Sequence, residues 1–286
     1  MVTTEQLTAW AVQGHLWLPL AVLCCLAVWE AFRPERRRES ARLWRWATNL
    51  GLELFSTVLM GWIALYAITV AVLQALGNPH TNVFEPVQLW GGPWAVLVAG
   101  CLLLDLAGYL VHRLEHAVFA LWCIHAVHHS DVDVDASTSV RHHPLEIVLS
   151  GVIMLPLILM LGLPMWVPLV YGVLAQIAQV MQHANWRLPE RLEDLLSLVV
   201  MTPGVHRAHH ATTAQYYDTN FGTVLSVWDR LFSTLGPRLP HGLAAPTFGV
   251  TGFRGPRYTR PHGALLLPFV MWRDGNQTAP PPNPTP

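Results

Sequence analysis

The chain has 286 residues, of which 52% are hydrophobic and 12% are charged, and its formal net charge is −1. Soluble domains carry roughly 25% charged residues, so this composition is typical of an integral membrane protein. It excludes a disordered chain, a disulfide scaffold and a strongly basic nucleic-acid-binding protein, because apolar residues are abundant and only 4 residues are Cys. The 15 histidines and the use of Arg for all 17 basic residues stand out.

Four nearly uncharged regions are long enough to cross a bilayer core, which takes about 20 helical residues. They are residues 6–29, 54–79, 94–116 and 147–182. The last region has 36 residues without a charge, enough for roughly two crossings, and we expect it to split near Gly162 and Pro164 into a hairpin. The sequence therefore predicts an all-α integral membrane protein with four to five transmembrane helices and a histidine-rich helical cap.

The arginines predict the orientation in the membrane, because cytoplasmic loops retain positive charge. Residues 33–45, after the first predicted span, hold six Arg, whereas residues 77–92 and the turn at Gly162 hold none. This bias places the N-terminus outside and residues 112–146 and 183–286 on the cytoplasmic side. We interpret the all-arginine chain as a bacterial inner-membrane protein. The arginine run is either a topology signal that contacts lipid headgroups or a docking surface for an acidic electron donor.

Nine histidines fall on that predicted cytoplasmic side, in three clusters and one single position. The clusters have the spacings HxxxH, HxxHH and HxxHH, and residues at i, i+3 and i+4 share one face of a helix. Each cluster can therefore aim two or three imidazoles at one point. Four ligands suffice for one metal ion, so nine imidazoles beside membrane spans indicate two metals. Imidazole ligands suit Zn, Cu, Fe and Ni alike.

These clusters resemble the signature of the fatty acid hydroxylase/sterol desaturase superfamily of membrane non-haem di-iron enzymes. Neighbouring residues extend the resemblance over roughly residues 100–235: Asp105, Tyr109 and Arg113, Leu121-Trp122, Ser130-Asp131, Arg141-His142-His143-Pro144-Leu145-Glu146, Gln182-His183-Ala184-Asn185, Thr202-Pro203, Asn220-Phe221-Gly222 and Trp228-Asp229-Arg230-Leu231-Phe232. The resemblance implies the following metal ligands: His112, His116, His125, His128, His129, His206, His209 and His210, with His183 as a ninth.

The resemblance also implies the reaction. Two iron ions and O2 would hydroxylate or desaturate a C–H bond of a membrane lipid, such as a sterol or a fatty acyl chain. No haem-binding or GxGxxG motif is present, so a separate ferredoxin or cytochrome with its reductase would supply electrons. No catalytic residue beyond the metal ligands is implied. The substrate, the choice between hydroxylation and desaturation, and the oligomeric state stay open.

Five further residues are candidates for supporting roles around the metals. Asp105 and Tyr109 form one helical stripe with His112 and His116, so Asp105 could orient a ligand imidazole. Of the adjacent pair His142 and His143, neighbours on a helix point about 100° apart, so we expect only one, His143, to face the metals; a capping role before Pro144 is the alternative. Asn220 and Asp229 match family positions without an assigned role.

Two other functions fit part of the sequence. The motif His112-Arg-Leu-Glu115-His116 matches the HxxEH pattern of inverted zinc proteases, with Glu115 as the general base, which favours a zinc-dependent membrane hydrolase. A catalytically silent lipid- or metal-binding protein is the third hypothesis. Asp131, Asp133 and Asp135 resemble the start of a calcium loop, but the positions that need Gly and Glu do not match.

The predicted organisation has three parts. Residues 1–92 hold the first spans and the arginine-rich loop, residues 93–240 form the catalytic domain, and residues 241–286 form a C-terminal segment. The end of that segment is rich in Pro, Asn and Thr, and we expect it to be disordered.

Overall fold

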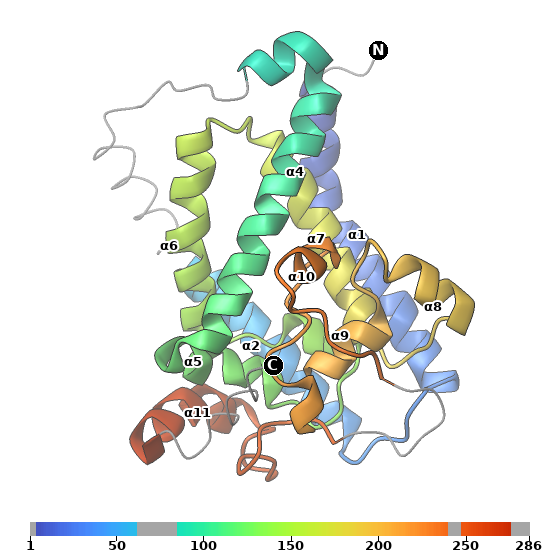
Figure 1. Ribbon diagram of the computed structural model, residues 1–286. Helices are drawn as coiled ribbons and strands as arrows, with labels where there is room; N and C mark the ends of the chain where they lie inside the picture. Colours follow the sequence, from blue (N-terminus) through green and yellow to red (C-terminus); the bar gives the residue numbers. More distant parts are fainter. Residues whose placement is uncertain (1–3, 62–84, 240–246, 276–286) are drawn as a thin grey trace.

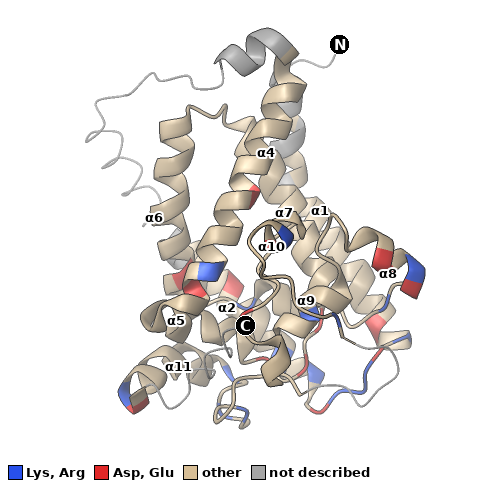
Figure 2. Cartoon of the chain, viewed as in Figure 1, with Lys and Arg blue, Asp and Glu red and all other residues tan. Residues whose placement is uncertain are grey.

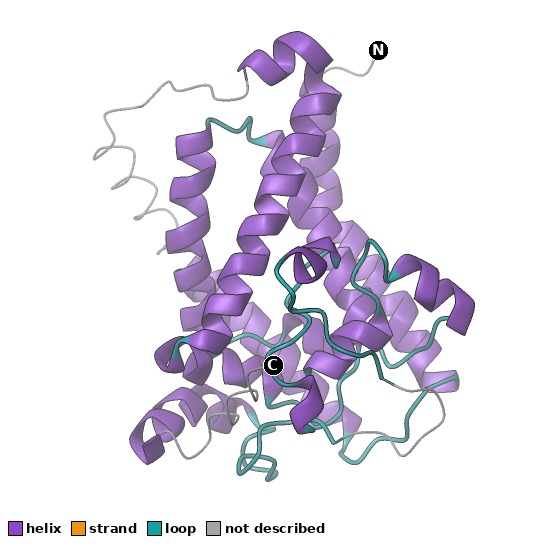
Figure 3. Cartoon of the chain, in the orientation of Figure 1, coloured by secondary structure: helices purple, strands orange, loops and turns teal. Residues whose placement is uncertain are grey.

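The computed structural model describes residues 4–61, 85–239 and 247–275, and its regular structure is helical (Figure 1). Figure 3 displays helices and loops with no strand in these ranges, where two isolated bridges are the only β pairings. The elements are α1 (Thr4–Phe32), α2 (Arg42–Phe55), the π-helix η1 (Ser56–Gly61), α4 (Glu85–Ala117), α5 (Phe119–His129), the 3-10 helix η2 (Ala136–Val140), α6 (Pro144–Leu161), α7 (Trp166–His183), α8 (Glu190–Leu196), α9 (Pro203–His209), the 3-10 helix η3 (Ala214–Tyr216), α10 (Val227–Leu231) and α11 (Pro261–Asp274). The all-helical prediction is therefore confirmed for the described residues.

Four long helices, α1, α4, α6 and α7, stand side by side, and the shorter helices gather at one end of them (Figure 1). Within the described residues, two helices are long and apolar enough to cross a membrane: Gly91–Ala117 and Pro144–Leu161. Trp17–Phe32 in α1 is apolar over a shorter length. Most of the second predicted span, residues 54–79, lies outside the described residues.

Small residues and glycines set how these helices turn and meet. Gly162 adopts φ +63° after the last turn of α6, a conformation that glycine tolerates best, and α7 begins at Trp166. This confirms that the region splits into two helices at Gly162. Gly100 lets α4 approach α7 closely, because a Cβ there would lie 2.5 Å from Val167 Cγ1. Around this approach Val96, Leu104 and Val167 form an apolar core.

Charged residues concentrate at the end of the long helices opposite the α6–α7 turn (Figure 2). Asp105 is the single charged residue in residues 94–112 of α4, residues 147–161 of α6 have none, and outward-facing side chains such as Val98 and Val152 are apolar and exposed. At the charged end α11 packs against α5, where Leu267 and Met271 are fully buried. Of the C-terminal tail predicted to be disordered, residues 276–286 lie outside the described residues.

Candidate metal centre

Nine buried or half-buried histidines from four helices converge at the charged end of the long helices. The clusters lie on α4, on α5 and on α9 with its C-terminal cap, as their helical spacings predict, and the single histidine ends α7. Their ligand atoms form two groups, each with all atoms within 4.8 Å of one another. The first group is His112, His116, His125, His129 and His209, and the second is His128, His183, His206 and His210.

The second group brings four Nε2 atoms around one point. His183 Nε2 lies 3.0 Å from His128 Nε2, 3.0 Å from His206 Nε2 and 3.1 Å from His210 Nε2. Each of these side chains is at least 95% buried. Two nitrogens bound at about 2.1 Å to one metal ion, at angles between 90° and 109°, lie about 3.0–3.4 Å apart. The spacing in this group therefore fits a single metal ion.

The first group has the same spacing but is more open. His209 Nε2 lies 3.1 Å from His112 Nε2, and His129 Nε2 lies 3.2 Å from His125 Nε2. His116 Nε2 is buried without a hydrogen-bond partner, and its ring lies 4.6 Å from that of His209. Five imidazoles can hold a second ion in this group, and the nine histidines then divide into five and four.

Backbone carbonyls hold the rings in the form that a metal ion needs. A carbonyl oxygen only accepts hydrogen bonds, so an Nδ1 beside one carries the proton, which leaves the lone pair on Nε2. Four rings have such a partner, two in each group: His112 with Phe221 O at 2.9 Å, His209 with Thr219 O at 2.6 Å, His128 with Arg141 O at 3.3 Å and His183 with Gln179 O at 2.7 Å. Their Nε2 lone pairs therefore face one another.

Burial keeps these imidazoles uncharged. It lowers the pKa of His125 to about 3, and burial together with neighbouring imidazoles holds the pKa of His128 and His210 well below 6.5. His183 Nε2 and His128 Nε2, and likewise His209 Nε2 and His112 Nε2, are then acceptors that face one another at 3.0–3.1 Å without a proton between them. A cation at their centre would satisfy every one of them, so the donor chemistry fits a metal.

A short loop after α9 presents the two carbonyls that hold the first group. Asn220 adopts φ +63°, and its side chain accepts from Gly236 N at 2.8 Å and donates to Val205 O at 3.2 Å. Asp229 accepts from the backbone N–H groups of Phe221 and Gly222, each at 2.8 Å. Asn220 and Asp229 therefore fix the loop that orients His112 and His209, without reaching a ring themselves.

The expected contact between Asp105 and a ligand imidazole is not formed. Asp105 accepts from Val224 N, Leu225 N, Trp228 Nε1 and Tyr171 Oη at 2.8–3.1 Å. The physical reason is distance along the helix, since His112 lies about two turns away. Asp105 therefore holds the backbone of Val224 and Leu225, just after the loop that Asn220 and Asp229 fix.

Tyr109, on the same stripe, also lies against that loop region. Its hydroxyl is 2.8 Å from Thr234 Oγ1, and its ring stacks on Phe232 at 5.3 Å between centroids. It contacts the loop rather than an imidazole nitrogen.

The adjacent histidines before α6 have the opposite arrangement to the one expected. His143 Nδ1 accepts from Leu145 N at 3.1 Å and caps α6, while its Nε2 faces Leu265 O at 3.2 Å. His142 instead stacks on His128, with ring centroids 4.8 Å apart. His143 does not face the metals, and its alternative role as a cap before Pro144 is confirmed. The pair precedes the helix, with ψ 140° at His143, so the 100° rule for helical neighbours does not apply.

Two carboxylates lie beside His125: Glu115, which the sequence offered only as the base of a zinc hydrolase, and Glu146, which was not predicted as part of the site. Glu146 Oε1 lies 3.0 Å from His125 Nδ1, and Glu115 Oε2 lies 3.6 Å from the same nitrogen. A carboxylate on the outer nitrogen of a metal-binding histidine fixes its tautomer and raises its basicity. Glu146 lies in the first turn of α6. Its contact with His125 could not be predicted from sequence spacing, because the contact depends on how α6 packs against α5.

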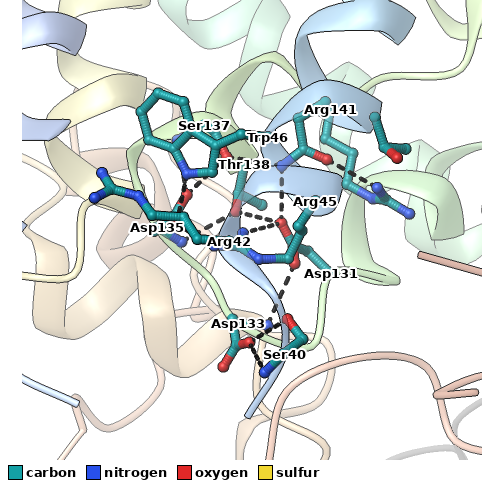
Figure 4. Close-up of polar contacts among 12 residues, drawn as sticks. Ser40, Arg42, Arg45, Trp46, Asp131, Asp133, Asp135, Ser137, Thr138 and Arg141 are labelled. Carbon is teal, nitrogen blue, oxygen red and sulfur yellow. Dashed lines mark hydrogen bonds and ion pairs between the residues drawn. The ribbon is translucent and has the colours of Figure 1, made fainter. Parts of the chain in front are cut away.

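A buried ionic network lies beside the end of α5, which carries one histidine of each group (Figure 4). Arg45 of α2 donates to both Asp131 and Asp135, and its side chain is 1% exposed. Arg141 donates to Val127 O at 2.8 Å and to Asn49 Oδ1 at 2.8 Å, which ties the end of α5 to α2. Burial alone would raise the pKa of Asp131. The positive charges of Arg45 and Arg141 outweigh this effect, so the pKa of Asp131 is lowered. The network holds the backbone that carries His128 and His129.

A cavity of about 400 Å³ opens onto both histidine groups. Helices α4, α6 and α7 form its walls, and His112, His125, His128, His183 and His206 form its floor. A molecule in this cavity would therefore touch residues of both groups at once.

Comparison with known proteins agrees with this site. The family model for fatty acid hydroxylase matches residues 97–234, which include all nine histidines. Alkylglycerol monooxygenase of Homo sapiens is 33% identical over 162 residues, which cover 55% of this chain and 35% of that protein. Ornithine lipid hydroxylase OlsE of Rhizobium tropici is 30% identical over 170 residues, which cover 58% of this chain and 49% of that protein.

The matched segment thus spans about a third to a half of the length of these relatives. No solved structure matches the chain. The histidine clusters, the matched family model and these two relatives agree with one another: residues 97–234 are similar to the fatty acid hydroxylase family.

Proposed function

We propose that this protein is a membrane-embedded lipid hydroxylase that uses two iron ions, O2 and two externally supplied electrons. The observation that carries the proposal is the arrangement of nine neutral imidazoles in two groups, with Nε2 atoms that face one another at 3.0–3.3 Å. Each group fits one ion, and the similarity of residues 97–234 to the fatty acid hydroxylase family favours iron over the other metals that imidazole binds. All nine histidines would serve as ligands.

The cavity supports a lipid as the substrate. Both relatives described above are named for the oxidation of lipids, one of an alkylglycerol and the other of an ornithine lipid, and both names specify hydroxylation or monooxygenation. The iron ions would supply the oxidising power for an unactivated C–H bond. In the balanced reaction, the C–H bond, O2, two electrons and two protons give a C–OH group and water. We therefore favour hydroxylation over desaturation.

The protein's own residues would bind and orient the substrate. The walls from α4, α6 and α7 surround the cavity and limit the access of water to the histidines. The floor histidines place the reacting carbon within reach of both groups. The carbonyls of Thr219, Phe221 and Arg141 keep the rings in one orientation. The catalytic part would be residues 93–240, between residues 1–92 and 241–286.

A membrane setting agrees with the two candidate spans and with the apolar side chains exposed on α4 and α6. In this setting the histidines lie at the cytoplasmic end, where a lipid can enter sideways from the bilayer and a ferredoxin or cytochrome can deliver electrons. The arginines of residues 33–45 do not form one docking surface, because Arg45 is buried against Asp131 while Arg33 and Arg37 are exposed. A donor would meet only the exposed members.

The test is oxidation of a lipid extract by purified protein in detergent, with a ferredoxin and its reductase, under 18O2. The proposal predicts lipid products that gain one labelled oxygen, and no product under nitrogen. A product formed without O2, or one that carries oxygen from labelled water, would contradict it. That second result would favour the zinc hydrolase, in which Glu115 acts as the base.

A further inference from the structure

A second cavity, which we call the α2–α11 cavity, lies apart from the one above the histidines. Its volume is about 360 Å³, and among the described residues the two cavities share no lining residue. The start of α2 with the residues before it, and the segment before α11, form most of its wall. Apart from Val132, its lining residues lie outside residues 97–234, so the similarity to the fatty acid hydroxylase family does not extend to this cavity.

Arg45 brings an unpaired N–H group to this cavity. Its two Nη atoms donate to Asp131 and Asp135, whereas its Nε is buried without a hydrogen-bond partner (Figure 4). The side chain is 1% exposed, and it lines the α2–α11 cavity. A buried donor without an acceptor is costly, so this N–H group calls for an acceptor on the cavity side.

The segment before α11 adds two more arginines to the wall. Arg254 donates through Nη2 to Glu39 Oε2 at 3.0 Å, and Glu39 is the one carboxylate among the described residues that line the cavity. Arg260 is exposed and forms no ion pair among the described residues. Because α11 begins directly after Arg260, the positive end of that helix lies beside the cavity.

The charges around the cavity leave a positive excess. The network of Arg45, Asp131, Asp135 and Arg141 is neutral as a whole, and Glu39 offsets Arg254. Residues 247–260 contain no acidic residue, so the charges of Arg260 and the neighbouring Arg257 are not offset within that segment. A water molecule in the cavity would accept from Arg45 but would not neutralise this excess, whereas an anion would do both.

The size and the walls of the cavity favour a phosphate with an organic part attached. Guanidinium groups from separate segments can surround the oxygens of a phosphate, with which arginine forms bidentate pairs. A cavity of about 360 Å³ has room for more than a phosphate group alone. Its remaining wall includes the exposed Trp44 and the apolar side chains of Val132 and Pro256, which suit an organic part.

We propose that the α2–α11 cavity binds an organic phosphate, with the phosphate group held by Arg45, Arg254 and Arg260 and the organic part against Trp44. The phosphate belongs to a lipid headgroup or to a soluble phosphate ester, because the same contacts serve both. Through Arg45 the ligand would join the network that holds the end of α5. This site goes beyond the proposed function, and binding requires neither iron nor O2.

The first experiment compares two pairs of probes that differ only in the phosphate group. They are glycerol 3-phosphate against glycerol, and dioctanoyl phosphatidic acid against dioctanoylglycerol. Binding to the full-length protein in a neutral detergent is measured by isothermal titration calorimetry at low salt. We expect at least one phosphate probe to bind at least about tenfold more tightly than its phosphate-free partner. Binding of the phosphatidic acid alone would assign the site to a lipid headgroup, and tighter binding of glycerol 3-phosphate would assign it to a soluble ester.

The second experiment locates the binding with a matched pair of variants. Arg260→Gln removes a guanidinium from the cavity wall, and Arg257→Gln removes one from the same segment that does not line the cavity. Both side chains are exposed, so neither change should unfold the protein. Arg260→Gln should weaken binding of the phosphate probe by about three- to tenfold, and Arg257→Gln by less than about twofold.

Two results would overturn the proposal. One is equal binding of each phosphate probe and its phosphate-free partner, which would leave the cavity to water. The other is equal weakening by both variants, which would indicate attraction to the overall charge of the segment rather than binding in the cavity. Neither result depends on metal content or product formation, so failure of this proposal is distinct from failure of the proposed function.

Discussion

Two buried polar clusters lie side by side in this protein, and they differ in how completely their atoms are paired. In the network of Arg45, Asp131, Asp135 and Arg141, opposite charges face one another, and most carboxylate oxygens accept from two or more donors (Figure 4). In the histidine groups, acceptor nitrogens of neutral rings face one another, as His183 Nε2 faces His128 Nε2 and His209 Nε2 faces His112 Nε2. The first cluster pairs its charges within the protein, with Arg45 Nε left without a partner, whereas the acceptors of the second gain partners only with cations.

The pairing of polar atoms distinguishes structural from functional polar groups better than their burial does. Arg45 and His183 are equally buried, each 1% exposed. Removal of a partner from the ionic network leaves an unpaired charge, which is a cost in folding. Removal of a histidine leaves fewer ligands, which is a cost in metal binding. The predictions below test that separation, from the largest expected effect to the smallest.

The largest effect is expected for His183→Ala, which leaves the second group with three ligands. Product formation should fall at least about 100-fold, and iron content should fall from about two to about one per chain, because the first group keeps all five imidazoles. Activity assays and metal analysis of the same preparation check this. Retention of both irons would show that His183 is not a ligand.

The next effect is expected for Arg45→Ala, which leaves Asp131 and Asp135 buried without their guanidinium partner. We expect a loss of about 3–5 kcal/mol in the free energy of unfolding, seen as a Tm lower by about 10 °C in detergent. The control Arg273→Ala removes an exposed pair with Asp274 and should leave Tm unchanged. An unchanged Tm for Arg45→Ala would mean that the network does not support the fold.

Acid should affect the two clusters in different pH ranges. In the metal-free protein the pKa of His125 is about 3 when folded and 6.5 when unfolded, so the unfolded state binds more protons between these values. The free energy of unfolding therefore falls as pH drops below about 6.5, by up to about 1.4 kcal/mol per pH unit for each such histidine. The pKa of Asp131 is lowered in the folded state, so its protonation also lowers the free energy of unfolding, but only below about pH 4. A stability curve that is flat from pH 7 to 5 would contradict the burial of neutral imidazoles.

The smallest effects are expected just outside the two groups. His142→Ala removes a ring that stacks on His128 but belongs to neither group, so both irons should stay bound. His143→Ala removes the cap of α6 and should cost about 1 kcal/mol, with iron content unchanged. Metal analysis and thermal unfolding of the two variants check this. Loss of iron from His142→Ala would show that His142 is a tenth metal ligand.

Much of this arrangement could be predicted from the sequence because it depends on local spacing. The patterns HxxxH and HxxHH place the histidines on helix faces, and the glycine at position 162 marks the turn of the α6–α7 hairpin. The division into five and four histidines is a tertiary property, because each group combines residues up to 97 positions apart.

The contacts that local spacing could not predict are made with residues far away in the sequence. Asp105 is bound by backbone groups 119 and 120 positions away, so its neighbours on the same helix were misleading. Arg45 belonged to an apparent surface run of arginines, but its carboxylate partners lie 86 and 90 positions further along. His143 was misjudged because it lies in extended backbone just before α6. Buried polar residues of this kind require the three-dimensional structure.

The central claim is that the two histidine groups hold two iron ions. The most direct test is metal analysis by inductively coupled plasma mass spectrometry on detergent-purified protein from iron-rich medium, with His128→Ala alongside. We expect about two irons per chain in the wild type and a clear loss in the variant. One zinc per chain without iron, unchanged in His128→Ala, would contradict it.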